Sequence, residues 1–142
     1  MEAIPNFQQF LKQHKIRRTE KDKPKALRLL KKAQEDLQAA NDMLSAERNG
    51  WALSIAYNSM LSCALALMAK AGFWPNSDSH HLAAVAYCSH IFGAQASDLV
   101  ILFNRYRIKR HDSIYGEELE VSQTEAQNSI NYAKEFLELA KK

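Results

Sequence analysis

The stretch RYRIKRHDSIYG, at positions 105 to 116, contains the side chains of this chain that could do chemistry. Within seven positions it holds five cationic or titratable residues, namely Arg105, Arg107, Lys109, Arg110 and His111. Guanidinium groups bind phosphate through paired hydrogen bonds, and an imidazole can transfer protons near neutral pH. The cluster is therefore compatible with a catalytic site, a phosphate-binding site or a solvated helix face.

A helical projection of residues 98 to 115 separates these side chains into faces. The expected core-facing stripe consists of Leu99, Leu102, Phe103 and Tyr106. The opposite side, which we expect to be solvated, carries Arg105, Lys109 and Asp112. Arg110 projects into the sector of Leu99 and Phe103, where its charge would lose hydration unless it is paired or lines a wet cleft.

The adjoining flank of this helix gathers groups suited to anion binding and proton transfer. Its members recur at i, i+3 and i+4 spacing and are Asn104, Arg107, Ile108, His111 and Tyr115. Two guanidinium groups nearby should lower the pKa of His111 and favour a neutral imidazole that accepts a proton, while Arg107 and Arg110 hold a phosphate. The alternative is that Arg110 pairs with a carboxylate of another helix, such as Glu47 or Asp42. In that case His111 would have no chemical role.

The chain before this helix contains three segments with helical patterns. Residues 23 to 48 carry an apolar stripe that steps by four and three positions, which predicts an amphipathic helix. Residues 51 to 71 are apolar nearly all round and predict a central helix that Gly72 ends. A third helix is expected over about 79 to 91, with a cap supplied by residues 77 to 79.

Two more helices complete the expected fold. The fourth begins near Ser97 or Asp98 and runs through the basic stretch, and the fifth begins at Ser122, where Glu125 completes a capping box. With only four Gly and three Pro, the chain has few residues for the tight turns of an all-β fold. We predict an all-α fold, an antiparallel up-down bundle of four main helices plus a shorter one.

The N-terminal residues 1 to 22 are expected to form an extension of the bundle at 23 to 142. A short helix could form around Phe7, Phe10 and Leu11, and KIRRTEKDK has the composition of a charged linker. The N-terminus lacks the order of a secretory signal, and the longest apolar run is too short to span a membrane. These features predict a cytoplasmic protein without a membrane partner.

Other candidate sites have less support. Cys63 and Cys88 lie in apolar contexts and are expected to be reduced core thiols. His80 and His81 follow Asp78, but they diverge in direction and lack a third ligand nearby in the sequence, so we expect no metal site. The chain has no phosphate-binding glycine loop and no dinucleotide fingerprint, and hence no predicted cofactor. Core or loop anchors, rather than base-stacking platforms, are expected for Trp51, Tyr57, Phe73 and Trp74.

The order of the motifs from about residue 24 to 141 resembles the HEPN superfamily of small helical bundles. The resemblance depends on KAQEDLQAA in the first long helix, on AYNSMLSCALALMAKAG with its pair Ala56 and Tyr57, on SHH, on RYRIKRHDSIY and on the terminal AKEFLELAKK. It implies a homodimer in which two basic helices meet across a cleft. It further implies one of two roles, a metal-independent ribonuclease of toxin-antitoxin systems or a non-catalytic module that binds a nucleotide or protein. A minimal nucleotidyltransferase is a frequent partner in this superfamily.

The nuclease motif of the superfamily is an Arg, usually followed by a polar residue, with a His after four to six intervening positions. Arg105 with His111 satisfies this spacing, but Arg105 projects away from the core. Arg110 with His111 as its polar neighbour fits the geometry better, and Tyr115 then stands at the position of the family's His. We therefore expect Arg110, His111 and Tyr115 to be the catalytic candidates, while the phosphate- or RNA-binding candidates are Asn104, Arg105 and Arg107.

Overall fold

The computed structural model describes residues 4–76, 80–114 and 120–142, and the side chains of all of these except 111–114. In chain order its elements are α1 (Phe7–Lys12), β1 (Ile16–Arg18), α2 (Lys23–Ser45), α3 (Asn49–Ala71), β2 (Phe73–Pro75), α4 (His80–Phe92), the 3-10 helix η1 (Gly93–Ala96), α5 (Ser97–Ile114) and α6 (Gln123–Lys141). The predicted all-α bundle is confirmed. The expected cap at residues 77 to 79 lies outside the described residues.

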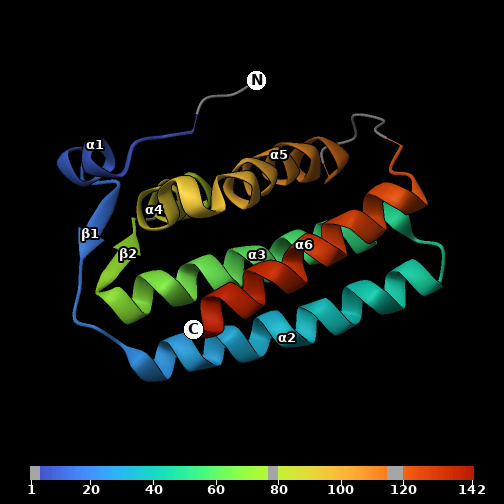
Figure 1. The fold of residues 1–142 in the computed structure, drawn as a ribbon, viewed down its shortest axis with the longest axis horizontal. Helices are drawn as coiled ribbons and strands as arrows, with labels where there is room; N and C mark the ends of the chain where they lie inside the picture. Colours follow the sequence, from blue (N-terminus) through green and yellow to red (C-terminus); the bar gives the residue numbers. More distant parts are fainter. Residues whose placement is uncertain (1–3, 77–79, 115–119) are drawn as a thin grey trace.

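Helices α2 and α3 lie side by side and run in opposite directions (Figure 1). The side chain of Asp22 caps α2 by accepting a hydrogen bond from the backbone N–H of Lys25 at 3.0 Å. Ala33 and Ala40 face α3 from α2 and are fully buried, and the hydroxyl of Ser59 donates to the carbonyl of Ala33 at 2.8 Å. Small side chains at this interface let the two helix backbones approach closely.

Helix α3 is the centre of the bundle, as its apolar composition predicts. It packs against α2, α4, α5 and α6, and α6 in turn contacts α2 (Figure 1). Ser122 caps α6 by accepting a hydrogen bond from the N–H of Glu125 at 3.0 Å, which confirms the predicted start of this helix.

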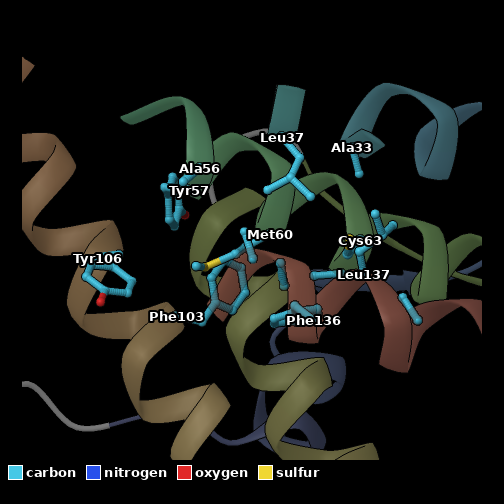
Figure 2. Packing of buried hydrophobic residues seen from close by; sticks show 14 of the residues in the cluster. Ala33, Leu37, Ala56, Tyr57, Met60, Cys63, Phe103, Tyr106, Phe136 and Leu137 are labelled. Atoms are coloured by element: carbon cyan, nitrogen blue, oxygen red, sulfur yellow. The ribbon is translucent and has the colours of Figure 1, made fainter. Parts of the chain in front are cut away.

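Aromatic side chains fill the region where α3, α5 and α6 meet. The ring centroids of Tyr57 and Phe103 are 5.5 Å apart, and those of Phe103 and Phe136 are 5.4 Å apart in an edge-to-face arrangement. All three residues are fully buried, and Figure 2 shows them gathered with Met60 in the core. Phe103 therefore fixes α5 on the bundle and sets the position of the basic residues that follow it.

The N-terminal segment docks on one end of the bundle. The predicted short helix is confirmed as α1. Its Phe7 ring packs edge-on against the rings of Phe73 and Tyr87, with centroid distances of 5.2 Å and 5.5 Å. The prediction of a charged linker was wrong for residues 16 to 18, which form β1 and pair antiparallel with β2. Ile16 is only 1% exposed, and its burial beside these aromatic residues stabilises the strand in addition to its pairing with β2.

Two helical stretches of the described residues are long and apolar enough to cross a membrane by length and composition, Asn49–Ala71 and His80–Arg110. The apolar window of α3 is 78% buried inside the fold, as expected of the core helix of a bundle. Only 28% of the window in the α4–η1–α5 stretch is buried, and Ile91 is 38% exposed there. Among the described residues of α4 and α5, Ile91 is the only exposed large apolar side chain, and Leu99, Ile101 and Leu102 are half-buried.

Gly72 is required by the turn that ends α3. Its φ is +88°, and a Cβ atom at this position would lie 2.9 Å from the carbonyl oxygen of Thr19. We expect Gly72→Ala to lower the free energy of unfolding by about 2 kcal/mol or more, because it combines a left-handed backbone with a backbone clash. Gly93 is the matched control, since its φ is +53° but a Cβ atom there would meet nothing within 4 Å, so Gly93→Ala should cost about 1 kcal/mol. If urea denaturation shows the same decrease in the free energy of unfolding for both variants, the clash with Thr19 has no effect.

Candidate phosphate-binding site

Helix α5 presents its basic residues in an ordered way because three of its side chains are anchored in the core. Val100, Phe103 and Tyr106 are buried, while Arg105 is exposed. The predicted stripe is confirmed for Phe103 and Tyr106, whereas Leu99 and Leu102 are only half-buried. Val100 takes the buried position nearest the start of the helix.

Arg110 turns inward, as its helical position predicts. Its guanidinium carbon lies 5.7 Å from the centroid of the Tyr57 ring, in a cation–π arrangement. Its Nε atom is buried and has no hydrogen-bond partner among the residues that the structure describes. No carboxylate of the described residues pairs with Arg110, so the alternative pairing with Glu47 or Asp42 was wrong. A buried donor without a partner is uncommon, and a bound anion is one way in which it could be satisfied.

Arg107 is held one turn before Arg110 by a buried amide. Its Nε donates a hydrogen bond to Oδ1 of Asn104 at 3.1 Å, and Asn104 is only 4% exposed. Asn104 is thus better placed to orient Arg107 than to contact a ligand itself. The two guanidinium groups lie on neighbouring parts of the same helix, so their positive potentials add.

The structure adds a pair of residues that the helical projection could not find. The hydroxyl of Tyr57, on α3, lies 2.7 Å from Nδ1 of His81, on α4, and the two rings stack at 5.6 Å with an interplanar angle of 15°. Tyr57 is fully buried, whereas His81 is half-buried. The expectation that Tyr57 is a core anchor is confirmed, but the residue also connects α4 to the basic helix. We refer to Tyr57, His81, Asn104, Arg107 and Arg110 as the Arg110 site.

Electrostatic effects keep the two rings of the Arg110 site, those of His81 and Tyr57, uncharged at neutral pH. Burial, then Arg110 and Arg107, and finally His80 lower the pKa of His81 below its usual value of 6.5, so its imidazole is neutral at pH 7. Burial raises the pKa of the Tyr57 phenol, although Arg107 and Arg110 oppose this shift. The phenol therefore stays protonated and uncharged. The positive charge of the two guanidinium groups is not neutralised by either neighbour.

The lowered pKa of His81 makes stability depend on pH in a defined direction. Between the pKa of His81 in the folded protein and 6.5, the unfolded chain binds more protons, so stability rises with pH across this window and falls on acidification. We expect His81→Gln to lose less stability between pH 7 and pH 5 than the parent protein in urea denaturation. Parallel pH profiles for His81→Gln and the parent would contradict the assignment.

Several predicted residues do not join the Arg110 site. Arg105 is exposed and acts electrostatically on Tyr106 rather than on Tyr57 or His81. The prediction that Lys109 is solvated was wrong, because its ammonium group is half-buried and forms an ion pair with Glu125 of α6. Three further predicted positions cannot be placed: the side chains of His111 and Asp112 lie outside the described set, as does Tyr115 altogether.

The two cysteines and His80 are reactive groups that lie outside the Arg110 site. Cys63 and Cys88 are buried free thiols, as predicted, and burial raises the pKa of Cys63 to about 12. Within the described ranges, no three His, Cys, Asp or Glu side chains come together as metal ligands. His80 packs against the Trp74 ring instead of the Arg110 site, with centroids 6.1 Å apart.

Comparison with known families agrees with this architecture. A search of curated proteins gives no match to the chain. The family model described as HEPN domain matches residues 26–142, from the first turn of α2 to the last residue, and so includes every residue of the Arg110 site. The match covers most of the chain and all of its long helices, and the chain therefore belongs to the HEPN family.

Proposed function

We propose that this HEPN domain is a metal-independent endoribonuclease of the toxin type that binds the RNA backbone at the Arg110 site. The single observation that carries the proposal is the unpartnered, buried Nε of Arg110, next to a second guanidinium group and two neutral rings. Phosphate offers an acceptor oxygen and a negative charge to the Nε of Arg110, which has no hydrogen-bond partner among the described residues. RNA is the polymer whose own 2′-hydroxyl can attack the adjacent phosphate without a metal ion.

The chemistry divides between charge stabilisation and proton transfer. The 2′-oxygen loses its proton and bonds to phosphorus, the bond from phosphorus to the 5′-oxygen breaks, and the 5′-oxygen takes up a proton. Arg107 and Arg110 stabilise the additional negative charge of the phosphorane, an effect worth about 10²- to 10³-fold per donor. His111 and Tyr115, which follow Arg110 in the sequence, are the proposed proton-transfer groups.

The active form in this proposal is a cytoplasmic homodimer. Support comes from the outer side of α4, where Ile91 is exposed, and from half-buried apolar residues of α5 such as Leu99 and Ile101. A second copy would cover this surface and bring two α5 helices together. A nucleotidyltransferase-like antitoxin is the proposed partner of the dimer, on the basis of the family resemblance alone.

A non-catalytic role is the second candidate. Tyr115 stands where the family's nuclease motif has its His, and a phenol with a pKa near 10 is a poor base at neutral pH. In this version the Arg110 site binds a nucleotide or an acidic partner protein without cleaving it.

Expression of the gene alone in a bacterium separates the two candidates. We expect growth to stop with the parent protein, to continue with Arg110→Ala at equal protein level, and to recover when an adjacent nucleotidyltransferase-like gene is co-expressed. Growth that is equal with the parent and with Arg110→Ala would favour the binding module.

A further inference from the structure

We infer that His81 is an anion-contacting residue of the Arg110 site, held by Tyr57 so that its Nε2–H donates to a phosphate oxygen. This inference rests on the proposed function and deepens it, because it adds a ligand-binding residue from α4 to the guanidinium groups of α5. Neither the family match nor the basic motif of α5 assigns a role to His81.

The hydrogen bond to Tyr57 selects one tautomer of the imidazole. The phenol keeps its proton because it is fully buried, and its hydroxyl lies 2.7 Å from His81 Nδ1. Among the described residues His81 is the only partner of this hydroxyl, so the phenol donates and Nδ1 accepts. The single proton of the neutral imidazole then resides on Nε2, at the opposite edge of the ring from the phenol.

The Nε2 edge is available to a ligand. His81 is half-buried, and its Nε2 has no hydrogen-bond partner among the residues that the structure describes. The ring stacks on Tyr57, the same ring over which the Arg110 guanidinium lies, so the phenol contacts both groups. Tyr57 thus holds an uncharged imidazole and a charged guanidinium against the same ring, and in our proposal both donate to the bound phosphate.

The charged and titratable groups around His81 determine how it responds to a ligand. Those acting on it are Tyr57 from α3, Arg107 and Arg110 from α5, and His80 from its own helix. All of these except the phenol are cationic or become so on protonation, and each opposes a second proton on His81. The negative charge of a bound phosphate favours a second proton on His81, so anion binding should raise the pKa of His81. By linkage, affinity for the anion should increase as the pH falls below 7.

The test uses the full chain labelled with ¹⁵N at histidine, with two probes. Inorganic phosphate represents a free phosphate group, and a 2′-O-methyl oligouridylate without terminal phosphates represents an uncleavable RNA backbone. We expect His81 in the free protein to show the Nε2–H tautomer, and its pKa to rise when the oligouridylate saturates the protein. A response to phosphate alone would identify a terminal phosphate as the ligand source and would still support the anion contact. An unchanged pKa with both probes at saturation, or a free protein with the proton on Nδ1, would overturn the inference.

Matched substitutions test the donor at Nε2. We expect His81→Leu to weaken oligouridylate binding about tenfold or more, as loss of a hydrogen bond to a charged group does. His81→Gln places an amide N–H near the position of Nε2, so it should recover most of the affinity at pH 7 while losing the increase at lower pH. His90→Leu, at an exposed position of the same helix, should bind as the parent does. Parental affinity of His81→Leu would overturn the role of His81 even if that of Arg110→Ala is lost.

Failure of this inference is distinguishable from failure of the proposed nuclease. An oligouridylate that binds and raises the pKa of His81, together with RNA that stays intact, supports the anion contact and overturns only the nuclease. RNA cleavage that depends on Arg110, combined with unchanged binding by His81→Leu, leaves the nuclease standing and overturns the contact.

Discussion

Replacing Arg110 with alanine is expected to lower RNA cleavage by the purified protein at least 100-fold. The guanidinium is the one group of the Arg110 site that combines a permanent charge with a buried donor lacking a partner. Its loss removes charge stabilisation that is needed most when the phosphorane forms, which corresponds to about 10²- to 10³-fold in rate for a comparable donor. The rate of cleavage of a fluorescently labelled RNA measures the effect.

A control of equal charge change separates site chemistry from general electrostatics. Arg28 is exposed on α2, so Arg28→Ala removes the same charge from a surface outside the Arg110 site. We expect Arg28→Ala to cleave at the parental rate. A similar decrease in cleavage rate for Arg28→Ala and Arg110→Ala would mean that net positive charge, rather than the position of Arg110, supports activity. Circular dichroism of both variants checks that each retains its helices.

Replacing Phe103 with alanine is expected to lower the free energy of unfolding by about 3–5 kcal/mol. Phe103 is fully buried between the rings of Tyr57 and Phe136, so truncation leaves a cavity where α3, α5 and α6 meet (Figure 2). Urea denaturation gives the change directly. Leu27, on α2, is 57% exposed, and Leu27→Ala should change stability by no more than about 0.5 kcal/mol.

The same substitution also tests how α5 is positioned. Because Phe103 anchors the helix that carries Arg107 and Arg110, RNA binding should weaken in Phe103→Ala even at a temperature where the variant remains folded. A variant as stable as the parent would contradict the assignment of Phe103 to the core. A destabilised variant with parental RNA affinity would show that α5 is positioned by other contacts.

The long helices could be predicted from the sequence because each has a strong local signal. The alternation of small and large apolar residues predicts the buried face of α2, and Ser122 with Glu125 marks the start of α6. The inward orientation of Arg110 also followed from helical geometry, since a residue seven positions after the buried Phe103 must share its side of the helix.

The parts that could not be predicted depend on contacts between distant segments. Tyr57 and His81 are 24 positions apart, and neither belongs to a local pattern of charged residues. The ion pair of Lys109 requires Glu125 to pass beside α5, which helical projection of one segment cannot reveal. Likewise β1 exists because β2 lies beside it, and three residues rich in arginine carry little strand signal alone.

In the proposed function, this chain cleaves RNA through the 2′-hydroxyl and without a metal ion. The most direct test measures the cleavage of two substrates that differ only at this hydroxyl. Purified protein is incubated in excess EDTA with a labelled RNA and with the same sequence fully 2′-O-methylated. We expect cleavage of the unmodified RNA to products with 2′,3′-cyclic phosphate ends, no cleavage of the methylated strand, and loss of activity with Arg110→Ala. Intact unmodified RNA, or equal cleavage of both strands, would contradict the proposed function.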